Sequence, residues 1–152
     1  MKNQQGFSLI ELLIVVAIIL IIASIAIPSM MRARVAANEA SAIAVIRTVT
    51  TSQILYKLTY PDVGYAAAIT NLGPSASPSP DRAGLLSIDL SDDPHAKNGY
   101  TFSTAGDEKV FSVYARPIPG QGVRSFCTDT PAIIYYGSDA DSCKPSGDHV
   151  LQ

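Results

Sequence analysis

An uninterrupted apolar run near the amino terminus is the feature that most constrains this chain. Residues 7–27 read FSLIELLIVVAIILIIASIAI, and only Ser8, Glu11 and Ser24 among them are polar. As an α-helix the run would be about 31 Å long, which matches the roughly 30 Å hydrocarbon core of a bilayer. Because it is apolar on every side, the run predicts a membrane-spanning helix and not a helix with one buried face.

A cleaved secretory signal peptide is the alternative interpretation of this run. Ser24-Ile25-Ala26 could serve as its small-residue cleavage site. Such peptides have a shorter apolar region, of about 7–15 residues. The length of the run therefore favours the membrane span.

The composition and charge of the chain exclude several classes of protein. Charged residues make up 16% of the 152 residues, against about 25% in an average soluble domain, which argues against a disordered chain. A formal net charge of −2 argues against a dedicated nucleic-acid-binding protein, which is usually basic. The sequence contains no haem-attachment, phosphate-binding or nucleophile-elbow motif, so we predict no enzyme activity and no cofactor.

A carboxylate, Glu11, lies one turn into the apolar run and needs a partner. An acid at the centre of a membrane helix costs roughly 2.5–3.5 kcal/mol, and less near an end. The helix dipole offsets only about 0.3–1 kcal/mol of that cost. Lys2 is the only nearby cation in the chain, and it lies outside the span. A partner for Glu11 on another chain is therefore expected.

The segment Gly6-Phe7-Ser8-Leu9-Ile10-Glu11-Leu12 resembles the leader and cleavage region of type IV pilins and of the related type II secretion pseudopilins. The resemblance implies that residues 1–6 are a leader, which a membrane-embedded prepilin peptidase removes by cutting between Gly6 and Phe7. It also implies that Phe7 becomes an N-methylated amino terminus. Glu11 would be the acid that guides subunit assembly. A neighbouring subunit could place the new amine of its Phe7 against Glu11, which would offset the cost of the buried acid.

The orientation in the membrane follows from the resemblance and from the cysteines. Lys2 precedes the span and Arg32 and Arg34 follow it, so the positive-inside rule is nearly undecided. The resemblance implies a single-pass protein of the inner membrane, with the leader in the cytoplasm and the carboxyl-terminal domain outside. After assembly the protein would lie in a cell-surface or periplasmic filament.

Residues 28–58 continue the helix in our interpretation. Pro28 cannot donate a hydrogen bond to Ser24, so the helix either ends there or has a flexible point within one long helix. The stretch after it is rich in alanine, lacks Gly and Pro, and has apolar residues at spacings of three and four. This pattern predicts one helix over 7–58, stopped by Tyr60-Pro61. Residues 7–27 would form the membrane or filament-core half, and residues 28–58 an amphipathic half.

Residues 59–98 are rich in Gly and Pro and are predicted to be a loop between the helix and a sheet. Residues 99–152 carry strand patterns at 100–103, 109–116, 123–127 and 132–136, separated by short turns. Short connections imply an antiparallel meander. We therefore predict an α+β fold, in which the long amino-terminal helix packs on a carboxyl-terminal antiparallel sheet.

Cys127 and Cys143 would close a 17-residue loop near the carboxyl terminus. A disulfide across such a loop stabilises the fold by about 3 kcal/mol. The pairing is expected outside the cytoplasm, and carboxyl-terminal disulfide loops are common in pilins. Two free buried thiols are the alternative.

Three groups of polar residues are candidate binding sites. Asp89, Asp92, Asp93 and His95 form an acidic cluster, which is typical of a turn. Asp139 and Asp141 could bind calcium as in some pseudopilins, but their spacing does not match an EF-hand. Arg116 and Arg124 could contact DNA, but two arginines on an acidic chain are weak support. No metal site is predicted, and this composition argues against nucleic acid as a partner.

The chain is therefore expected to be a structural subunit of a type IV pilus for adhesion, motility or DNA uptake. Its partners would be identical or homologous pilin subunits in a helical polymer, the prepilin peptidase, the inner-membrane assembly machinery and, before assembly, membrane lipid. A type II secretion pseudopilin is the alternative. A membrane-anchored binding domain that never polymerises is a more distant one.

Overall fold

The computed structural model describes residues 7–138, Cys143, Val150 and Leu151, and of Ile88 and Asp89 the backbone alone. The chain divides into two compact units, Met1–Arg34 and Val35–Gln152. Gly6, the leader and the acids Asp139 and Asp141 lie outside the described residues.

One helix, α1, runs from Leu9 to Thr59 and belongs to both units. The predicted helix over 7–58 is confirmed, with each end displaced by one or two residues. It stops directly before Tyr60-Pro61, because the residue that precedes a proline avoids the helical conformation. Pro28 lies inside α1, so the predicted continuation of the helix is confirmed and the alternative that it ends there is wrong.

The first unit consists of the apolar part of α1, whose side chains are not covered. Large apolar residues from Phe7 to Met31 are exposed, with Leu9 at 81% and Met31 at 63%. Among the described residues, α1 is the one helix that is long and apolar enough to cross a membrane. The polar Ser24 is satisfied within the helix, because its hydroxyl donates to the carbonyl of Ile21 at 2.8 Å.

The second unit contains a five-stranded antiparallel sheet with the strand order β1-β2-β3-β4-β5. Its strands are β1 (Ala96–Lys97), β2 (Tyr100–Gly106), β3 (Phe111–Pro117), β4 (Ser125–Asp129) and β5 (Ile134–Gly137). The predicted meander is confirmed. Sequence patterns missed β1, because two residues are too few to show an alternation.

The strands β3 and β5 begin later than the sequence predicts, because the residues before them belong to turns. Asp107 Oδ1 accepts hydrogen bonds from the backbone N–H groups of Lys109, at 2.7 Å, and Val110, at 2.9 Å. These bonds hold Lys109 and Val110 in a turn, so β3 begins at Phe111 and not at Lys109. Ala132 has a positive φ of 61° and therefore belongs to the turn before β5.

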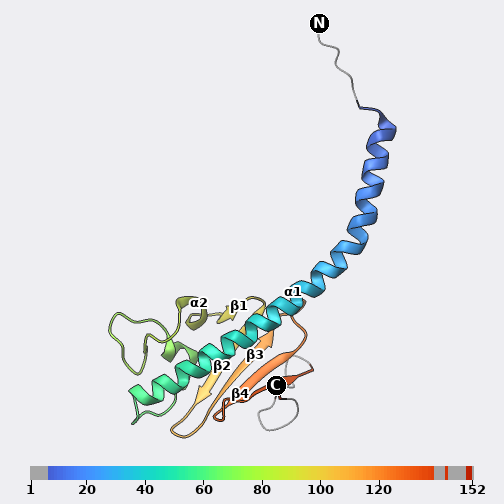
Figure 1. Ribbon diagram of the computed structural model, residues 1–152. Helices are drawn as coiled ribbons and strands as arrows, with labels where there is room; N and C mark the ends of the chain where they lie inside the picture. Colours follow the sequence, from blue (N-terminus) through green and yellow to red (C-terminus); the bar gives the residue numbers. More distant parts are fainter. Residues whose placement is uncertain (1–6, 139–142, 144–149, 152) are drawn as a thin grey trace. The chain divides into compact units, whose positions relative to one another are not determined.

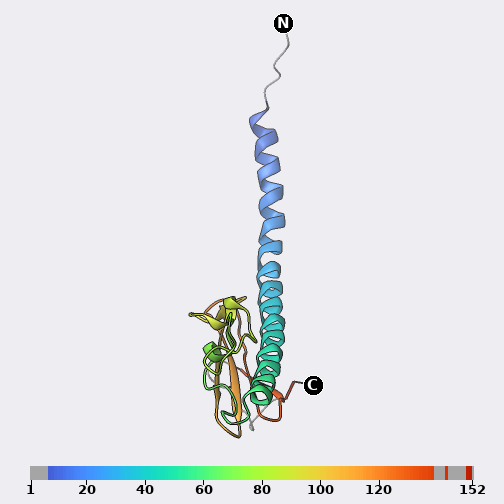
Figure 2. The same cartoon turned by 90° about the vertical axis from the view of Figure 1, so that its left-hand side faces the viewer.

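The part of α1 from Val35 onward lies against one face of the sheet (Figures 1 and 2). Ile46 and Val49 of α1 are fully buried in one cluster with Val113 and Phe126 of the sheet. The helix buries its residues at spacings of three and four, as its sequence predicts. The structure is thus the expected two-layer α+β fold.

The segment between α1 and the sheet contains the short helices η1 (Ile69–Leu72) and α2 (Ile88–Ser91), as well as β1. Its breaker-rich sequence did not reveal these elements. The carbonyl of Leu72 accepts the N–H groups of Leu85, at 2.9 Å, and Leu86, at 2.8 Å. The hydroxyl of Tyr56 on α1 donates to the carbonyl of Pro80 at 2.7 Å. The bonds of Leu72 join the two segments that flank the Ser/Pro-rich stretch 74–80, and the bond of Tyr56 attaches the end of this stretch to α1.

Candidate functional site

The start of α1 brings together two of the residues singled out from the sequence. Phe7 precedes the helix and is 83% exposed, and Glu11 is exposed in the first turn. The backbone N–H of Ser8 donates to Glu11 Oε2 at 3.2 Å. Glu11 therefore has a local role within its own chain, because it satisfies a backbone donor at the helix start.

Sequence reasoning missed this local role of Glu11, although a signal was present. A serine followed three residues later by glutamate, directly before an apolar run, is the signature of a capping box. Ser8-Leu9-Ile10-Glu11 fits that pattern. The bond from the Ser8 N–H to Glu11 forms the half of the box in which the acid reaches back to the cap residue.

The first unit has an exposed apolar surface around Glu11. Monomeric soluble proteins rarely expose apolar patches larger than a few hundred Å². Here the large apolar side chains from Phe7 to Met31 are all exposed. Such a surface requires either lipid or the apolar surfaces of other chains around it.

A disulfide joins Cys127 on β4 to Cys143, with their Cα atoms 5.9 Å apart. Both residues are buried. The expected pairing is confirmed, and the alternative of two free thiols is wrong. The bond ties the carboxyl-terminal segment to the sheet, where the backbone N–H of Leu151 also donates to the carbonyl of Ile134 on β5.

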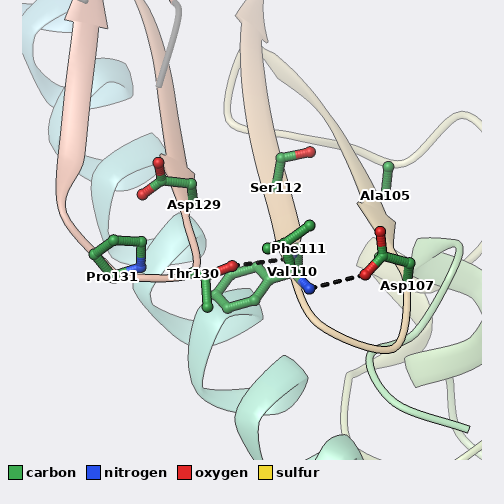
Figure 3. A pocket seen from close by; sticks show the side chains of 9 residues that line it. Ala105, Asp107, Val110, Phe111, Ser112, Asp129, Thr130 and Pro131 are labelled. Atoms are coloured by element: carbon green, nitrogen blue, oxygen red, sulfur yellow. Dashed lines mark hydrogen bonds between the residues drawn. The ribbon is translucent and has the colours of Figure 1, made fainter. Parts of the chain in front are cut away.

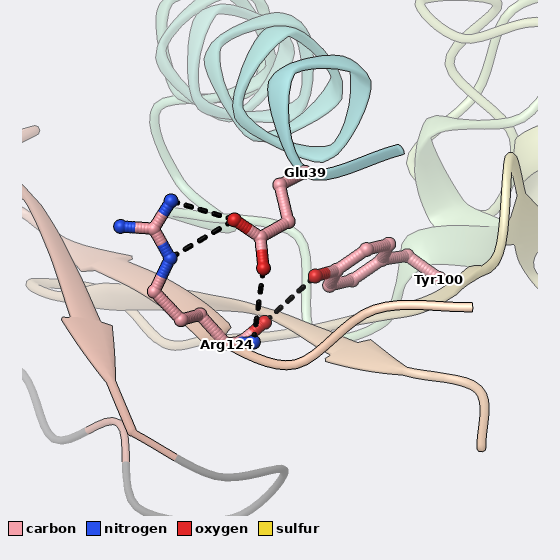
Figure 4. Close-up of polar contacts among 3 residues, drawn as sticks. All are labelled: Glu39, Tyr100 and Arg124. Atoms are coloured by element: carbon pink, nitrogen blue, oxygen red, sulfur yellow. Dashed lines mark hydrogen bonds and ion pairs between the residues drawn. The ribbon is translucent and has the colours of Figure 1, made fainter. Parts of the chain in front are cut away.

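An ion pair fastens α1 to the segment that leads into β4 (Figure 4). Glu39 Oε2 accepts hydrogen bonds from Arg124 Nε at 2.9 Å and Nη2 at 2.6 Å, and Oε1 accepts from the Arg124 backbone N–H at 3.2 Å. The hydroxyl of Tyr100 on β2 donates to the carbonyl of Arg124 at 2.8 Å. Arg124, a candidate DNA contact in the sequence, is thus already paired with Glu39 within the fold.

The charges of this cluster shift its pKa values. Burial alone would raise the pKa of the Glu39 carboxyl, but the hydrogen bonds and positive charge of Arg124 outweigh burial, so that pKa lies below its ordinary 4.5. Burial and the negative charge of Glu39 raise the pKa of Tyr100 to about 12. Glu39 is therefore ionised and Tyr100 protonated at neutral pH. In these states the carboxylate accepts from Arg124 and the tyrosine hydroxyl donates to it, so both groups stabilise the fold.

A depression of about 520 Å³ lies where the β2–β3 and β4–β5 turns meet (Figure 3). Thr130 Oγ1 in its wall accepts the backbone N–H of Phe111 at 3.1 Å, and Asp107 accepts the N–H groups of its own turn. Hydrogen bonds from Val110 and Lys109 lower the pKa of the Asp107 carboxyl. Thr130 and Asp107 are thus already bonded to backbone groups at this end of the sheet.

Asp92, one acid of the cluster before β1, is bonded to a residue of the preceding loop. Arg82 Nη2 lies 2.8 Å from Asp92 Oδ1 and forms an exposed ion pair. Within the described part of the chain, no group of three or more His, Cys, Asp or Glu side chains could hold a metal ion.

Comparison with known proteins gives a consistent set of matches. Residues 1–27 match the family model described as the prokaryotic N-terminal methylation motif. The chain is 38% identical over 80 residues to the type IV wide pilus major component PilA4 of Thermus thermophilus, an alignment that covers 52% of this chain and 61% of that relative. It is 30% identical over 128 residues to the type II secretion system core protein G of Vibrio cholerae, covering 80% of this chain and 85% of that relative.

Proposed function

Since this chain belongs to the family of type IV pilins and type II secretion pseudopilins, we propose that it is a subunit of a type IV pilus and polymerises through α1. The bare apolar surface of residues 7–31 carries the proposal. That surface suits lipid before assembly and the helices of other subunits after it. Transfer from lipid to a helix bundle gains little hydrophobic free energy, so packing and polar pairs must favour the bundle.

Processing at the amino terminus is the first step of the proposed function. The prepilin peptidase would cut between Gly6 and Phe7 and methylate the new amine of Phe7. The match of residues 1–27 to the methylation motif supports this step. Phe7 lies before the first turn of α1 and is exposed, which leaves it accessible to a peptidase.

Assembly is the second step, and Glu11 is its proposed polar contact. The bond from Ser8 to Glu11 uses one carboxylate oxygen, and the side chain is exposed, so the other oxygen can accept the amine of Phe7 from a neighbouring subunit. An ionised pair in an apolar bundle stabilises it only if both charges are well hydrogen-bonded. Pro28 would provide a flexible point in α1, since proline removes one helical hydrogen bond.

A secretion pseudopilin is the second candidate, and a specific observation favours it. The similarity to the secretion protein G extends over 80% of this chain, whereas the similarity to the wide-pilus component covers 52%. We rank the pilus first because the identity over the aligned residues is higher, at 38% over 80 residues against 30% over 128.

The test is to shear the cell surface, collect filaments and measure the intact mass of this protein in them. A mass lacking residues 1–6 and carrying one added methyl group is expected. A processed protein that stays in the cell envelope would instead favour the pseudopilin. An uncut protein would contradict both assignments.

The proposed location of the chain differs before and after assembly. The unassembled chain would cross the inner membrane once, with its sheet domain outside the cytoplasm. The assembled chain would lie in the filament, and adhesion, motility and DNA uptake are the roles that such a filament could have.

A further inference from the structure

Among the described residues of the first unit, the charged side chains lie at the two ends of a twenty-residue apolar stretch of α1. Glu11 is at one end, and Arg32 and Arg34 are at the other. The twenty residues from Leu12 to Met31 contain no Asp, Glu, Lys or Arg. All of them belong to α1, so their spacing along the helix is known.

That spacing matches the thickness of a bilayer. Glu11 and Arg32 are 21 positions apart, which corresponds to about 31 Å along an α-helix. The hydrocarbon core of a bilayer is about 30 Å thick. When Arg32 lies at one headgroup layer, Glu11 therefore lies at the opposite one, and the carboxylate does not have to enter the hydrocarbon.

The two arginines are accessible to partners from outside their own chain. Both are exposed, and neither has a hydrogen-bond or ion-pair partner among the residues that the structure describes. The first carboxylate that follows them, Glu39, is already bonded to Arg124. Their guanidinium groups remain available to an external anion.

The geometry of the pair suits two separate phosphate groups. Residues two positions apart point about 200° away from each other on a helix, so Arg32 and Arg34 face opposite sides of α1. The aliphatic stem of an arginine can lie along the apolar tails while its head reaches the headgroup layer. A guanidinium also matches a phosphate in a planar, two-bond geometry that a lysine cannot copy.

We propose that Arg32 and Arg34 bind the phosphate groups of anionic phospholipids on opposite sides of α1. This contact sets the depth of the unassembled chain in the membrane and holds Glu11 at the other headgroup layer. The proposal rests on the proposed function, because it concerns the membrane-inserted state that precedes assembly.

The test uses the full chain in vesicles that carry trace amounts of headgroup-proximal spin-labelled phosphatidylglycerol or phosphatidylcholine. Electron paramagnetic resonance then gives the fraction of each lipid that the protein immobilises. We expect phosphatidylglycerol to be preferred by about five-fold or more, since one basic residue at an anionic surface contributes about that factor. The double variant R32Q/R34Q should abolish the preference, and R32K/R34K should retain only part of it.

Arg47 provides the matched control, since it is an exposed arginine of the same helix but belongs to the Val35–Gln152 unit. The R47Q variant should keep the full preference for phosphatidylglycerol. Circular dichroism of each variant checks that the sheet domain is still folded. A wild-type chain without any preference, or an equal loss in R47Q, would overturn the proposal.

Processing and filament yield, measured on the same variants in cells, separate this proposal from the proposed function. If the wild-type chain is cut and assembles but shows no lipid preference, the lipid contact is wrong and the pilus assignment stands. If R32Q/R34Q keeps the lipid preference but loses filaments, the arginines contact a neighbouring subunit, and the lipid contact is again overturned. If the wild-type chain shows the lipid preference but remains uncut, the pilus assignment fails and the lipid contact stands.

Discussion

At the scale of single residues, the carboxylate of Glu39 joins two segments that are 85 positions apart in the chain. Its side chain is 9% exposed, whereas that of Arg124 is 43% exposed. If Glu39 lost its charge, solvent could still hydrogen-bond the exposed guanidinium of Arg124. The buried side chain at position 39 would be a weaker partner for the Arg124 N–H groups. The pair should therefore contribute to stability more than an exposed surface pair does.

We predict that Glu39→Gln lowers the free energy of unfolding by about 1–3 kcal/mol at pH 7. Because the folded-state pKa of Glu39 lies below 4.5, the stabilisation is complete above that value. It is lost as the pH falls further, through the folded-state pKa. Urea unfolding of both proteins between pH 7 and pH 3 measures the difference, which should shrink toward acid.

Glu108→Gln, in the exposed β2–β3 turn, is the control for this charge. It should change stability by less than about 0.5 kcal/mol at every pH. A pH-independent difference for Glu39→Gln would mean that the carboxyl contributes through packing and not through its charge.

The two roles of Glu11, local cap and contact between subunits, can be separated by substitution. Glutamine can replace glutamate in a capping box, so Glu11→Gln keeps the local bond and removes only the charge. Glu11→Val removes both. If the ionised pair with Phe7 drives assembly, both variants should lose most sheared filaments, with circular dichroism of the detergent-solubilised chain unchanged.

The amount of this protein in sheared filaments, relative to the cell total, is the measurement for both variants. Normal filament yield for Glu11→Gln together with loss for Glu11→Val would assign Glu11 to capping alone. The charge-pair interpretation would then be incorrect.

At the scale of elements, a buried glutamine joins α1 to two other parts of the second unit. Gln53 is fully buried, and its amide donates to the carbonyl of Ala66 at 3.0 Å and to Thr104 Oγ1 on β2 at 2.8 Å. Its Oε1 accepts the backbone N–H of Ala66 at 2.8 Å. Gln53 thus supplies both backbone partners of Ala66, where neither a helix nor a strand supplies them.

We predict that Gln53→Leu destabilises the fold by about 2–4 kcal/mol, although leucine is more apolar and of similar size. The reason is that two backbone groups of Ala66 would remain buried without partners, each at about 1–3 kcal/mol. Thermal or urea unfolding of the disulfide-bonded protein measures the loss. Thr51→Leu, on the exposed side of the same helix, is the control and should be nearly neutral.

At the scale of the whole molecule, the two units differ in where their apolar side chains lie: the second unit buries them in a core, and the first exposes them. The unit from Val35 onward has its own core, a five-stranded sheet and a disulfide. The unit up to Arg34 consists of exposed apolar helix and has no core among its described residues. The second unit should fold by itself, and the first should require lipid or other subunits.

We therefore predict that a chain beginning at Val35 is a soluble monomer with the sheet and the disulfide intact. Gel filtration and far-ultraviolet circular dichroism check the size and the secondary structure. The full chain should require detergent under the same conditions. Aggregation of the shortened, oxidised chain would indicate that the apolar part of α1 is needed for folding.

Local patterns in the sequence were sufficient for the fold class. The apolar run over 7–27, the helical spacing of Ala42, Val45 and Val49, and the breakers before each strand act over a few residues, so they can be read without the structure. The same holds for the resemblance around Gly6 and Glu11. The capping role of Glu11 was also readable and was overlooked.

What the sequence by itself determined is therefore the apolar helix, its continuation past Pro28 and the order of strands β2 to β5, because these depend on neighbouring residues. The tertiary structure decided the ion pair of Glu39 with Arg124 and the buried contacts of Gln53 with Ala66 and Thr104. It also decided which acids of the turns are already bonded. Such contacts join residues that are distant in the chain, and no local pattern specifies them; they form only when packing brings the groups together and burial makes an unpaired polar group costly.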